Sequence, residues 1–428
     1  MRKLLRAAGA IVACLLTACG SSSSTTPADI RLVNTTGTSV TMTLNGGYAL
    51  TVNSNSLSGY EQVPPGTYTS SVSSVNGSLN PSSQTVELGT AEAYTSIAYA
   101  RGTSVYSSTI TDNLAVPAIG YATLDVANIS PDAGQLDVYL LAPGTTSLSP
   151  GNSPNFSSVA FQTQSTAATF TAGSWNVIVT GAGDQSDVRL TLIGSAGAGA
   201  ITLTSQQVGT LALTDTPGGT LVNAFVITQG VGGTVTAYPN TAARLRVLSA
   251  VTTTPPSAVV LTTTAGTVLP TVYAPNESGY VLVTAGDTIA TITVAGTAIA
   301  IPAGAFAAGN DYTVLVYTSA TNVSTAALLT DNNELSGVSS EVRVINGAVT
   351  PVDGVSVNYG GVPIATGVFL GDASAYTGVK PSASAILSVN GSGYSYVGAQ
   401  PPFDPPVASV FTIFVSSSSS AVSIFRDR

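Results

Sequence analysis

The 428-residue sequence has no histidine, only two cysteines and one tryptophan. Without histidine, Ser-His-Asp and Cys-His catalytic sites are excluded, and so are the usual zinc sites. Both cysteines, Cys14 and Cys19, lie near the N-terminus, so the remaining chain must hold together by packing alone, without a disulfide. Beyond residue 18 the only lysine is Lys380, which we expect in a solvated turn and not in a Ser-Lys nucleophile pair.

Charge is also scarce. Charged residues make up 8 % of the chain, the formal net charge is −9 and the mean hydropathy is +0.37. A disordered chain combines low hydrophobicity with high charge, so this composition indicates folding around large cores. An acidic surface with almost no lysine argues against a nucleic-acid partner, because nucleic acids require clustered positive charge.

The N-terminus has the layout of a secretory signal peptide. Three cations, Arg2, Lys3 and Arg6, precede an apolar run over residues 7–18. That run is shorter than the roughly 20 residues that a membrane-spanning helix needs. We therefore predict a leader over residues 1–18, followed by a flexible, polar tether over residues 19–29.

The end of the leader, Leu16-Thr17-Ala18-Cys19, resembles the lipobox of bacterial lipoproteins. The resemblance implies that signal peptidase recognises Leu16, Thr17 and Ala18, that the chain is cut before Cys19, and that Cys19 then carries palmitate-like acyl chains. Several acyl chains give a stable membrane anchor. The expected location is the cell envelope, at the outer membrane if the cell is Gram-negative, with the side it faces left open. The alternative is an ordinary signal peptide with an incidental cysteine.

The rest of the chain contains four repeats that begin alike. They start with "IRLVN" at Ile30, "LDVAN" at Leu124, "LRVLS" at Leu245 and "VRVIN" at Val342, so the spacings are 94, 121 and 97 residues. Alternating apolar and polar residues indicate a half-buried strand at each start. The predicted domains, called units 1 to 4 below, cover residues 30–118, 119–240, 241–335 and 336–428.

Later landmarks recur in each unit. An apolar strand comes near the end, as in "AYTSIAYA" from Ala93, and the unit closes on a motif such as "TDN" at Thr111. In unit 2 the matching strand is "AITLTS" from Ala200 and the closing motif is "TDT" at Thr214, which leaves residues 220–240 as an extra segment.

Between these landmarks the sequence reads as short strands separated by turn signals. No segment has a convincing helical period with caps. Units of this length with several short strands predict an all-β fold of tandem immunoglobulin-like β-sandwich domains. The alternative, one long β-solenoid, requires a repeat of about 20 to 30 residues, which the sequence does not show.

The start of unit 2, "VANISPDAGQLDVYLLAPG" from Val126 to Gly144, resembles the domain-of-unknown-function 4397 family. Repeats of that family open with an apolar strand, an N-x-S-P-D-A turn and a V-D-V-Y-like strand. Unit 4 matches fairly well, while units 1 and 3 lack the S-P-D-A turn. The resemblance implies a β-sandwich repeat on exported bacterial proteins, and it supplies no catalytic residues.

Few residues qualify for chemistry. Asp132 and Asp137 are the nearest to a carboxylate pair for glycoside hydrolysis, but turn capping is the favoured interpretation. In "TDNNE", the side chains of Asp331, Asn333 and Glu334 offer hard oxygen ligands and form a weak calcium candidate, against the alternative of a polar turn. Trp175 occupies the position of Tyr68 in unit 1, which favours a core role over a sugar platform. We expect no cofactor and no metal.

These observations predict a non-enzymatic, lipid-anchored protein of the cell envelope that acts as a surface spacer, adhesin or structural binding module. Its partners would be the membrane, through Cys19, and an unknown protein or glycan. The alternative is a carbohydrate-binding surface lipoprotein that captures glycans. Glycan binding predicts exposed aromatic side chains clustered on one unit, whereas a spacer predicts none and a stiff, extended shape.

Overall fold

The fold is entirely β in the part of the chain that the structure describes. A computed structural model describes residues 26–112, 115–195, 199–253, 255–351, 353–392, 394–398, 403–416 and 422–428. These residues form 35 strands and no helix, and so include no helix that could cross a membrane. The leader, Cys19 and most of the tether lie outside the described residues. The predicted all-β fold of tandem sandwiches is confirmed.

Each unit consists of two sheets packed face to face. We call the sheet that contains the first strand of a unit its inner sheet, and the other its outer sheet. In unit 1 the inner sheet is β4 (Ser56–Leu57), β1 (Ala28–Asn34), β8 (Ala93–Arg101) and β9 (Ser104–Thr111), with β5 (Glu61–Val63) also on β1, and the outer sheet is β3 (Tyr48–Val52), β2 (Val40–Leu44), β6 (Gly66–Ser74) and β7 (Ser82–Leu88).

Unit 2 is the largest. Its inner sheet is β13 (Thr163–Gln164), β10 (Tyr121–Asn128), β18 (Val208–Asp215), β19 (Val222–Thr228) and β20 (Val235–Tyr238), with β14 (Ala168–Thr171) on β10. Its outer sheet is β12 (Phe156–Val159), β11 (Leu136–Leu141), β15 (Gly173–Gly181) and β16 (Val188–Leu192), with β17 (Ile201–Leu203) on β15.

Units 3 and 4 are more compact. In unit 3 the inner sheet is β23 (Val281–Thr284), β21 (Ala242–Ala250), β26 (Asp311–Thr318) and β27 (Ser324–Asp331), and the outer sheet is β22 (Val259–Thr263), β24 (Ile289–Val294) and β25 (Thr297–Ala298). In unit 4 the inner sheet is β31 (Thr377–Val379), β28 (Ser340–Asn346), β34 (Val410–Val415) and β35 (Val422–Arg426), and the outer sheet is β30 (Val362–Val368), β29 (Val355–Tyr359), β32 (Leu387–Gly391) and β33 (Tyr394–Val397).

The same topology recurs in all four units. The first strand pairs in parallel with a strand near the end of its unit: β1 with β8, β21 with β26 and β28 with β34, each the strand before last, and β10 with β18, which two further strands follow. With strands lettered A to H in chain order, unit 4 has the sheets D-A-G-H and C-B-E-F. Constant-type immunoglobulin domains have the sheets ABED and CFG, so the sandwich architecture is shared but the strand order differs.

Two local contacts explain why each repeat start forms this strand. One is a serine hydroxyl that accepts a hydrogen bond of 2.9 Å from the backbone of the first strand in every unit, as Ser58 does from Leu32. The other is the asparagine of "LVN", "VAN" and "VIN", whose side-chain oxygen accepts the backbone N–H two residues on, as Asn34 does from Thr36. In units 1, 2 and 4 the repeated sequence therefore encodes both the strand and the turn that ends it, whereas unit 3 has Ser249 in place of the asparagine.

One assignment within unit 2 was wrong by one strand. "AITLTS" forms β17 in the outer sheet, whereas the strand that pairs with β10 is β18, which ends on the "TD" of residues 214–215. Most of the supposed extra segment forms the next two inner-sheet strands, β19 and β20. Both β17 and β18 are short and apolar, so the sequence pattern alone could not tell which of them belongs beside β10.

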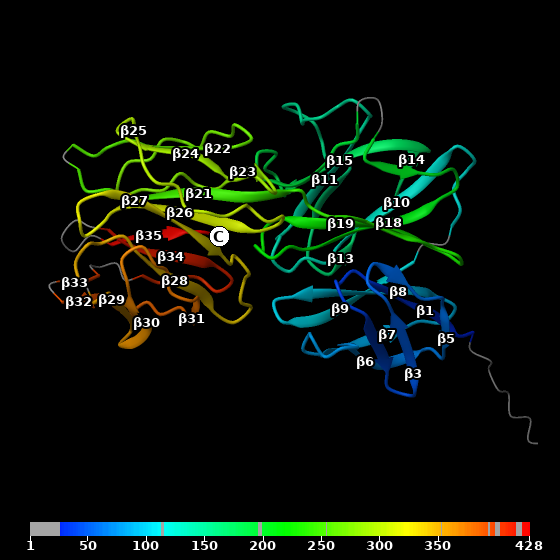
Figure 1. The fold of residues 1–428 in the computed structure, drawn as a ribbon. Helices are drawn as coiled ribbons and strands as arrows, with labels where there is room; N and C mark the ends of the chain where they lie inside the picture. Colours follow the sequence, from blue (N-terminus) through cyan, green and yellow to red (C-terminus); the bar gives the residue numbers. More distant parts are fainter. Residues whose placement is uncertain are drawn as a thin grey trace, which may run out of the picture.

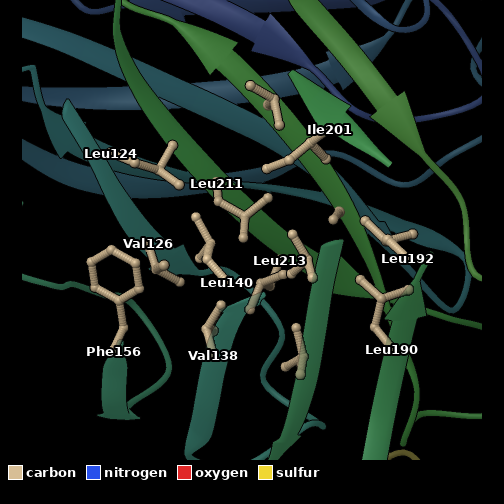
Figure 2. Packing of buried hydrophobic residues seen from close by; sticks show 14 of the residues in the cluster. Leu124, Val126, Val138, Leu140, Phe156, Leu190, Leu192, Ile201, Leu211 and Leu213 are labelled. Carbon is tan, nitrogen blue, oxygen red and sulfur yellow. The ribbon is translucent and has the colours of Figure 1, made fainter. Parts of the chain in front are cut away.

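Each unit has its own apolar core between its two sheets. Figure 2 shows the core of unit 2, where Leu124, Val126, Leu211 and Leu213 of the inner sheet pack against the outer sheet. Outer-sheet strands alternate buried and exposed residues, as in β2. The central strands of the inner sheets are buried almost continuously, as in β8 and β18, so both of their faces are covered.

The four units form a compact block. Units 1 and 2 stack through their inner sheets, units 3 and 4 do the same, and the two pairs lie side by side (Figure 1). This arrangement differs from the stiff, extended shape that a spacer predicts.

Candidate functional site: the contacts between units and the cavity at their junction

The inner sheets present apolar side chains to the neighbouring unit. Between units 1 and 2, Val33, Ile97 and Ile110 meet Ala212 and Phe225. Between units 3 and 4 the buried residues are Leu248, Ala250, Leu315, Ile345 and Phe414. Burying apolar surface on both faces of the inner sheets stabilises each pair in the same way as a protein core.

A buried arginine lies on this outward face in three of the units. It is the second residue of the repeat start, and each side chain is about 1 % exposed. Each arginine stands opposite a threonine of the parallel neighbouring strand and donates to its hydroxyl: Arg31 to Thr95 at 2.8 Å, Arg246 to Thr313 at 2.9 Å and Arg343 to Thr412 at 3.2 Å. The sequence contains few cations, and these three are placed where two sandwiches meet.

The arginines of units 3 and 4 reach across the interface reciprocally. Arg246 of unit 3 pairs with Asp427 of unit 4 at 2.7 Å, and Arg343 of unit 4 pairs with Asp331 of unit 3 at 2.6 Å. All four side chains are at most 1 % exposed. Each unit therefore offers the same surface to the other, as in an isologous dimer, but within one chain.

A tyrosine covers each arginine of this network. The guanidinium carbon of Arg246 lies 4.7 Å from the ring centre of Tyr280, and that of Arg343 lies 5.1 Å from the ring centre of Tyr376. Burial raises the pKa of both tyrosines. Although burial alone would raise the pKa of Asp331, the charges of Arg343 and Arg246 hold it below its usual range. The network is therefore ionised and closed to water.

Unit 2 lacks the arginine, the tyrosine and the closing aspartate of the other units and has different residues in their places. Asp125 stands where the other units have arginine, Ala167 where they have tyrosine, and Gln229 where they have the closing aspartate. Gln229 donates to Thr210 at 2.8 Å, and Asp125 accepts from Gln164 at 3.0 Å. Burial raises the pKa of Asp125 to about 6, in spite of these hydrogen bonds. The first interface is thus asymmetric, and Arg31 of unit 1 donates to the backbone oxygen of Thr228 across it at 3.1 Å.

The two pairs of units are joined by a second set of contacts. Arg101, at the end of β8 in unit 1, binds both carboxylate oxygens of Asp132 in unit 2 at 2.6 and 2.7 Å. Arg101 also donates to the backbone oxygen of Leu335, and the backbone N–H of Leu335 donates to Asp132 at 2.6 Å. A loop of unit 2 meets unit 3 through the backbone, from Gly218 to Gly309 at 2.8 Å. These contacts fix both pairs relative to each other.

A cavity lies at this junction. Its volume is about 420 Å³, and its wall includes Tyr99, Arg101, Asp215, Asn332 and Glu334, which come from units 1, 2 and 3. A neighbouring cavity of about 320 Å³ shares Arg101, Asn332 and Glu334. Burial and the charge of Asp132 raise the pKa of Asp215 to about 7, and burial raises that of Glu334. The junction cavity therefore has polar walls with weakened acids, as many binding sites do.

The carboxylate candidates have separate roles. Asp132 is the partner of Arg101 between units. Asp137 caps loops within unit 2, because its oxygens accept the backbone N–H groups of Ser158 at 2.7 Å and Gly183 at 2.9 Å. Asp132 therefore serves a contact between units, and Asp137 serves the loops within unit 2.

The residues of the calcium candidate do not converge on one point. Asp331 is held by arginines, Asn333 donates its amide to Asp311 at 2.7 Å, and Glu334 borders the junction cavity. Among the described residues, no group of three or more acidic side chains is placed to hold a metal ion. "TDNNE" is therefore a connection between units whose side chains already have protein partners.

Trp175 and Lys380 both occupy positions that a structural role explains. The Trp175 ring packs edge-on against Phe170, with centroids 5.7 Å apart, beside the core of unit 2. Its indole donates to the backbone oxygen four residues earlier, as Tyr68 does in unit 1. Lys380 is exposed just after β31. Leu16, Thr17, Ala18 and Cys19 lie outside the described residues.

The role of the interface arginines was not predicted from the sequence, although the sequence contains a signal for it. In a chain with 12 cations, three of the four repeat starts have arginine at the same position within an apolar strand. A cation repeated in such strands must find a buried partner, and the aspartates that close three units were the available partners.

Comparisons with known proteins give limited help. Residues 28–139 match the family model described as "Domain of unknown function (DUF4397)". No curated protein matches the chain. A solved structure from Bacteroides uniformis ATCC 8492, provisionally described as a cell adhesion protein, is 14 % identical, covers 50 % of this chain and 99 % of its own, and has a TM-score of 0.23. That score is too low to support an argument about either fold or function. The resemblance to the domain-of-unknown-function 4397 family is confirmed, over unit 1 and the first two strands of unit 2.

Proposed function

We propose that this chain is a non-enzymatic, lipid-anchored protein of the bacterial cell envelope that acts as an adhesin or structural binding module. The observation that carries the proposal is the fusion of four sandwiches into one block by buried ion pairs between units. A block of this kind keeps its outward faces in fixed relation. Such a property suits a protein that presents binding surfaces, and catalysis does not require it.

The position of β1 supports a load-bearing role. β1 begins where the predicted tether ends, and it lies in the middle of its inner sheet between β8 and the short strands β4 and β5. It pairs with β8 in parallel over six residues, from Asp29 to Asn34. A pull on the tether would load these hydrogen bonds together in shear, and rupture under force depends on the unfolding rate.

The compact shape favours adhesion or assembly over a spacer. Tyr106, Tyr273 and Phe369 are exposed by 36, 49 and 55 %, and they belong to units 1, 3 and 4. Exposed aromatic side chains are thus spread over the block. The pattern expected for a glycan platform on one unit is not met by these residues.

One observation keeps glycan capture as a second candidate. A groove of about 540 Å³ on unit 1, at the edges of β7 and β9, is bordered by Gln84, Glu87, Tyr94, Ser108 and Thr109. Amide, carboxylate and hydroxyl groups beside one aromatic ring are groups that sugar hydroxyls can bond. Binding of a glycan array by the wild type, lost in Gln84→Ala and Ser108→Ala variants, would favour this candidate.

The adhesive function is tested in the parent bacterium by deleting the gene and restoring it. We expect deletion to reduce attachment of cells to one another or to surfaces, and the wild-type chain to restore it. Shaving intact cells with protease reports whether the block is exposed. Unchanged attachment by cells that display the protein would contradict the proposal.

The anchor is tested separately with Cys19→Ala. Because acylation needs the Cys19 thiol, we expect this variant to keep its leader or be cut elsewhere, and to lose metabolic labelling with a fatty acid. Cys14→Ala is the matched control and should mature normally. A Cys19→Ala chain that matures and still partitions with membranes would show that the anchor lies elsewhere.

A further inference from the structure

The cavity that adjoins the junction cavity combines aromatic rings with polar side chains. We call it the neighbouring cavity; its volume is about 320 Å³, and Tyr106 of unit 1 and Tyr376 of unit 4 both line it. Apart from Leu335, the rest of its described wall is polar, with carboxylate, amide and hydroxyl groups from Glu334, Glu341, Asn332, Ser104 and Ser336. Aromatic rings beside such groups are a combination that suits sugars, which have both C–H faces and hydroxyls.

Tyr106 is held in place by a second ring. It stands directly opposite Tyr99 on the antiparallel strands β8 and β9, and the two rings stack with centroids 5.8 Å apart and an interplanar angle of 27°. Tyr99 is 4 % exposed and borders the junction cavity, whereas Tyr106 is 36 % exposed. Because the buried ring fixes the exposed one, a ligand meets a surface that is already ordered and loses little binding free energy in ordering it.

The sandwich repeat does not require an aromatic ring at the position of Tyr106. When the units are aligned on the threonines that face their first strands, this position holds Asn223 in unit 2 and Thr325 in unit 3. Tyr106 also lies outside the apolar core of unit 1 and outside the apolar contact between units 1 and 2. Its exposed ring is therefore available for a ligand without a conflicting structural role.

The charges of the wall restrict the class of ligand. Glu334 and Glu341 are acids, whereas the one cation in the described wall, Arg101, already binds both oxygens of Asp132. An anionic ligand would meet these carboxylates without a free counter-cation in the described wall, and like charges at short range repel. Among the described residues no group of three acidic side chains is placed to hold a metal ion. A neutral ligand that is rich in hydroxyls fits both the rings and the polar groups.

We propose that the neighbouring cavity binds a neutral sugar residue, whose ring packs on Tyr106 and whose hydroxyls bond Asn332 and Glu341. The C–H face of a sugar suits an aromatic ring, because the face of that ring is negative. Sugar hydroxyls donate and accept, so they match both a carboxylate, which only accepts, and an amide, which does both. The junction cavity, of about 420 Å³, offers room for the next sugar of a chain, and both volumes lie within the range of small-ligand sites.

The inference rests on the proposed function as a binding module and names the class of its ligand. The walls of the neighbouring cavity come from units 1, 3 and 4, so the site is complete only when the two pairs of units lie side by side. It is therefore distinct from the groove at β7 and β9, which belongs almost wholly to unit 1. The contacts around Arg101 and Asp132 would then serve to assemble the binding site.

The test is a glycan array, followed by calorimetry, on the whole chain in detergent. The neutral probes are cellotriose, maltotriose, mannotriose, galactotriose and chitotriose. The acidic probes are sialyllactose and trigalacturonate, which differs from galactotriose in having carboxylates. We expect at least one neutral trisaccharide to bind and both acidic probes not to bind.

Variants of the wall locate the binding. Tyr106→Ala and Glu341→Gln should each lower the affinity about tenfold or more, whereas Tyr106→Phe keeps the ring and should change it by less than about threefold. Tyr273→Ala is the matched control, because it removes an exposed tyrosine from unit 3, and it should leave binding unchanged. Gln84→Ala, in the groove of unit 1, should also leave binding unchanged.

Several results would overturn the proposal. They are no binding of any neutral probe to the folded wild type, equal binding of galactotriose and trigalacturonate, or undiminished binding by Tyr106→Ala. Loss of binding in Gln84→Ala but not in Tyr106→Ala would assign the sugar to the groove of unit 1 instead. If Tyr106→Ala fails to fold, Glu341→Gln decides, because its side chain is half-buried at the start of β28.

The outcome is separable from that of the adhesive function. Attachment is measured on cells, so a chain that binds no sugar but restores attachment would keep the adhesive function and lose this site. A chain that binds a neutral trisaccharide through Tyr106 but does not affect attachment would keep the site and lose the adhesive function.

Discussion

Single residues show how a charge-poor sequence uses its few charges. Arg246, Arg343, Asp331 and Asp427 are buried as reciprocal pairs, and burial is tolerated because each charge meets an opposite one. Asp125 is the exception, since it stands in the same place without an arginine. Its pKa is raised to about 6, because burial in that position disfavours the charged carboxylate.

The position of Asp125 leads to a prediction about pH. A folded-state pKa above the unfolded value of 3.8 means that the folded state binds the proton more tightly, so this contribution to stability is present below pH 3.8 and is lost as the pH rises through 6. At pH 7.5 the loss is about 2 to 3 kcal/mol. We expect Asp125→Asn to raise the melting temperature at pH 7.5 and to have little effect near pH 4.

Asp184→Asn is the matched control in the same unit. Its carboxylate is exposed, and hydrogen bonds from Ser186 lower its pKa, so its replacement should give no gain at pH 7.5. If Asp125→Asn melts at or below the wild-type temperature at pH 7.5, the buried carboxylate is not a source of instability.

At the scale of individual strands, part of this structure could be predicted from the sequence. Alternation in "IRLVN" and its three counterparts indicated the first strands, and the repeat gave four sandwiches. Alternation reports burial of one face only, so it could not say that the inner sheets are covered on both faces. Nor could alternation show whether β17 or β18 lies beside β10, because both segments are short and apolar.

The candidate site was largely beyond sequence reasoning. Asp331 and Glu334 were noticed as acids in "TDNNE", but the cations near them lie in other units, Arg343 in unit 4 and Arg101 in unit 1. Contacts of this kind depend on which sheet faces which, and the strand pattern is equally compatible with several pairings of four similar units.

At the element scale, the reciprocal ion pairs between units 3 and 4 predict that substitutions of Arg343 and Asp331 have coupled effects on the free energy of unfolding. Arg343→Met leaves Asp331 buried without its closest cation, which should lower the free energy of unfolding by about 3 to 5 kcal/mol. Adding Asp331→Asn removes the stranded charge, so the double variant should be more stable than Arg343→Met alone. Chemical denaturation of the two single variants and the double variant measures this coupling.

Arg426→Met is the control, because Arg426 is exposed on the neighbouring strand β35 and its loss should cost less than about 1 kcal/mol. Strict additivity of Arg343→Met and Asp331→Asn would mean that the ion pair does not contribute to the contact between units 3 and 4.

At the scale of the whole molecule, the block is organised as two pairs and not as four independent beads (Figure 1). Each unit has a core of its own, yet the outward face of its inner sheet is apolar and contains buried charge. An isolated unit would expose that face to water, where an apolar patch invites association. The pair is therefore the smallest part of the chain with a complete surface.

This organisation predicts which fragments fold. Residues 241–428 keep the pairing of units 3 and 4, with Ile345 and Phe414 covered and both Arg–Asp pairs intact. Residues 336–428 alone lose all of these contacts. Residues 119–335, a fragment of similar size, join units 2 and 3 but leave both inner sheets without their partners. We expect the first fragment to be soluble and to melt cooperatively, and the other two to aggregate or to melt at lower temperature. Circular dichroism and light scattering distinguish these outcomes. Equal stability of 241–428 and 119–335 would mean that the sheet-to-sheet contacts are incidental, and that the chain is held together at the junction around Arg101 and Asp132 instead.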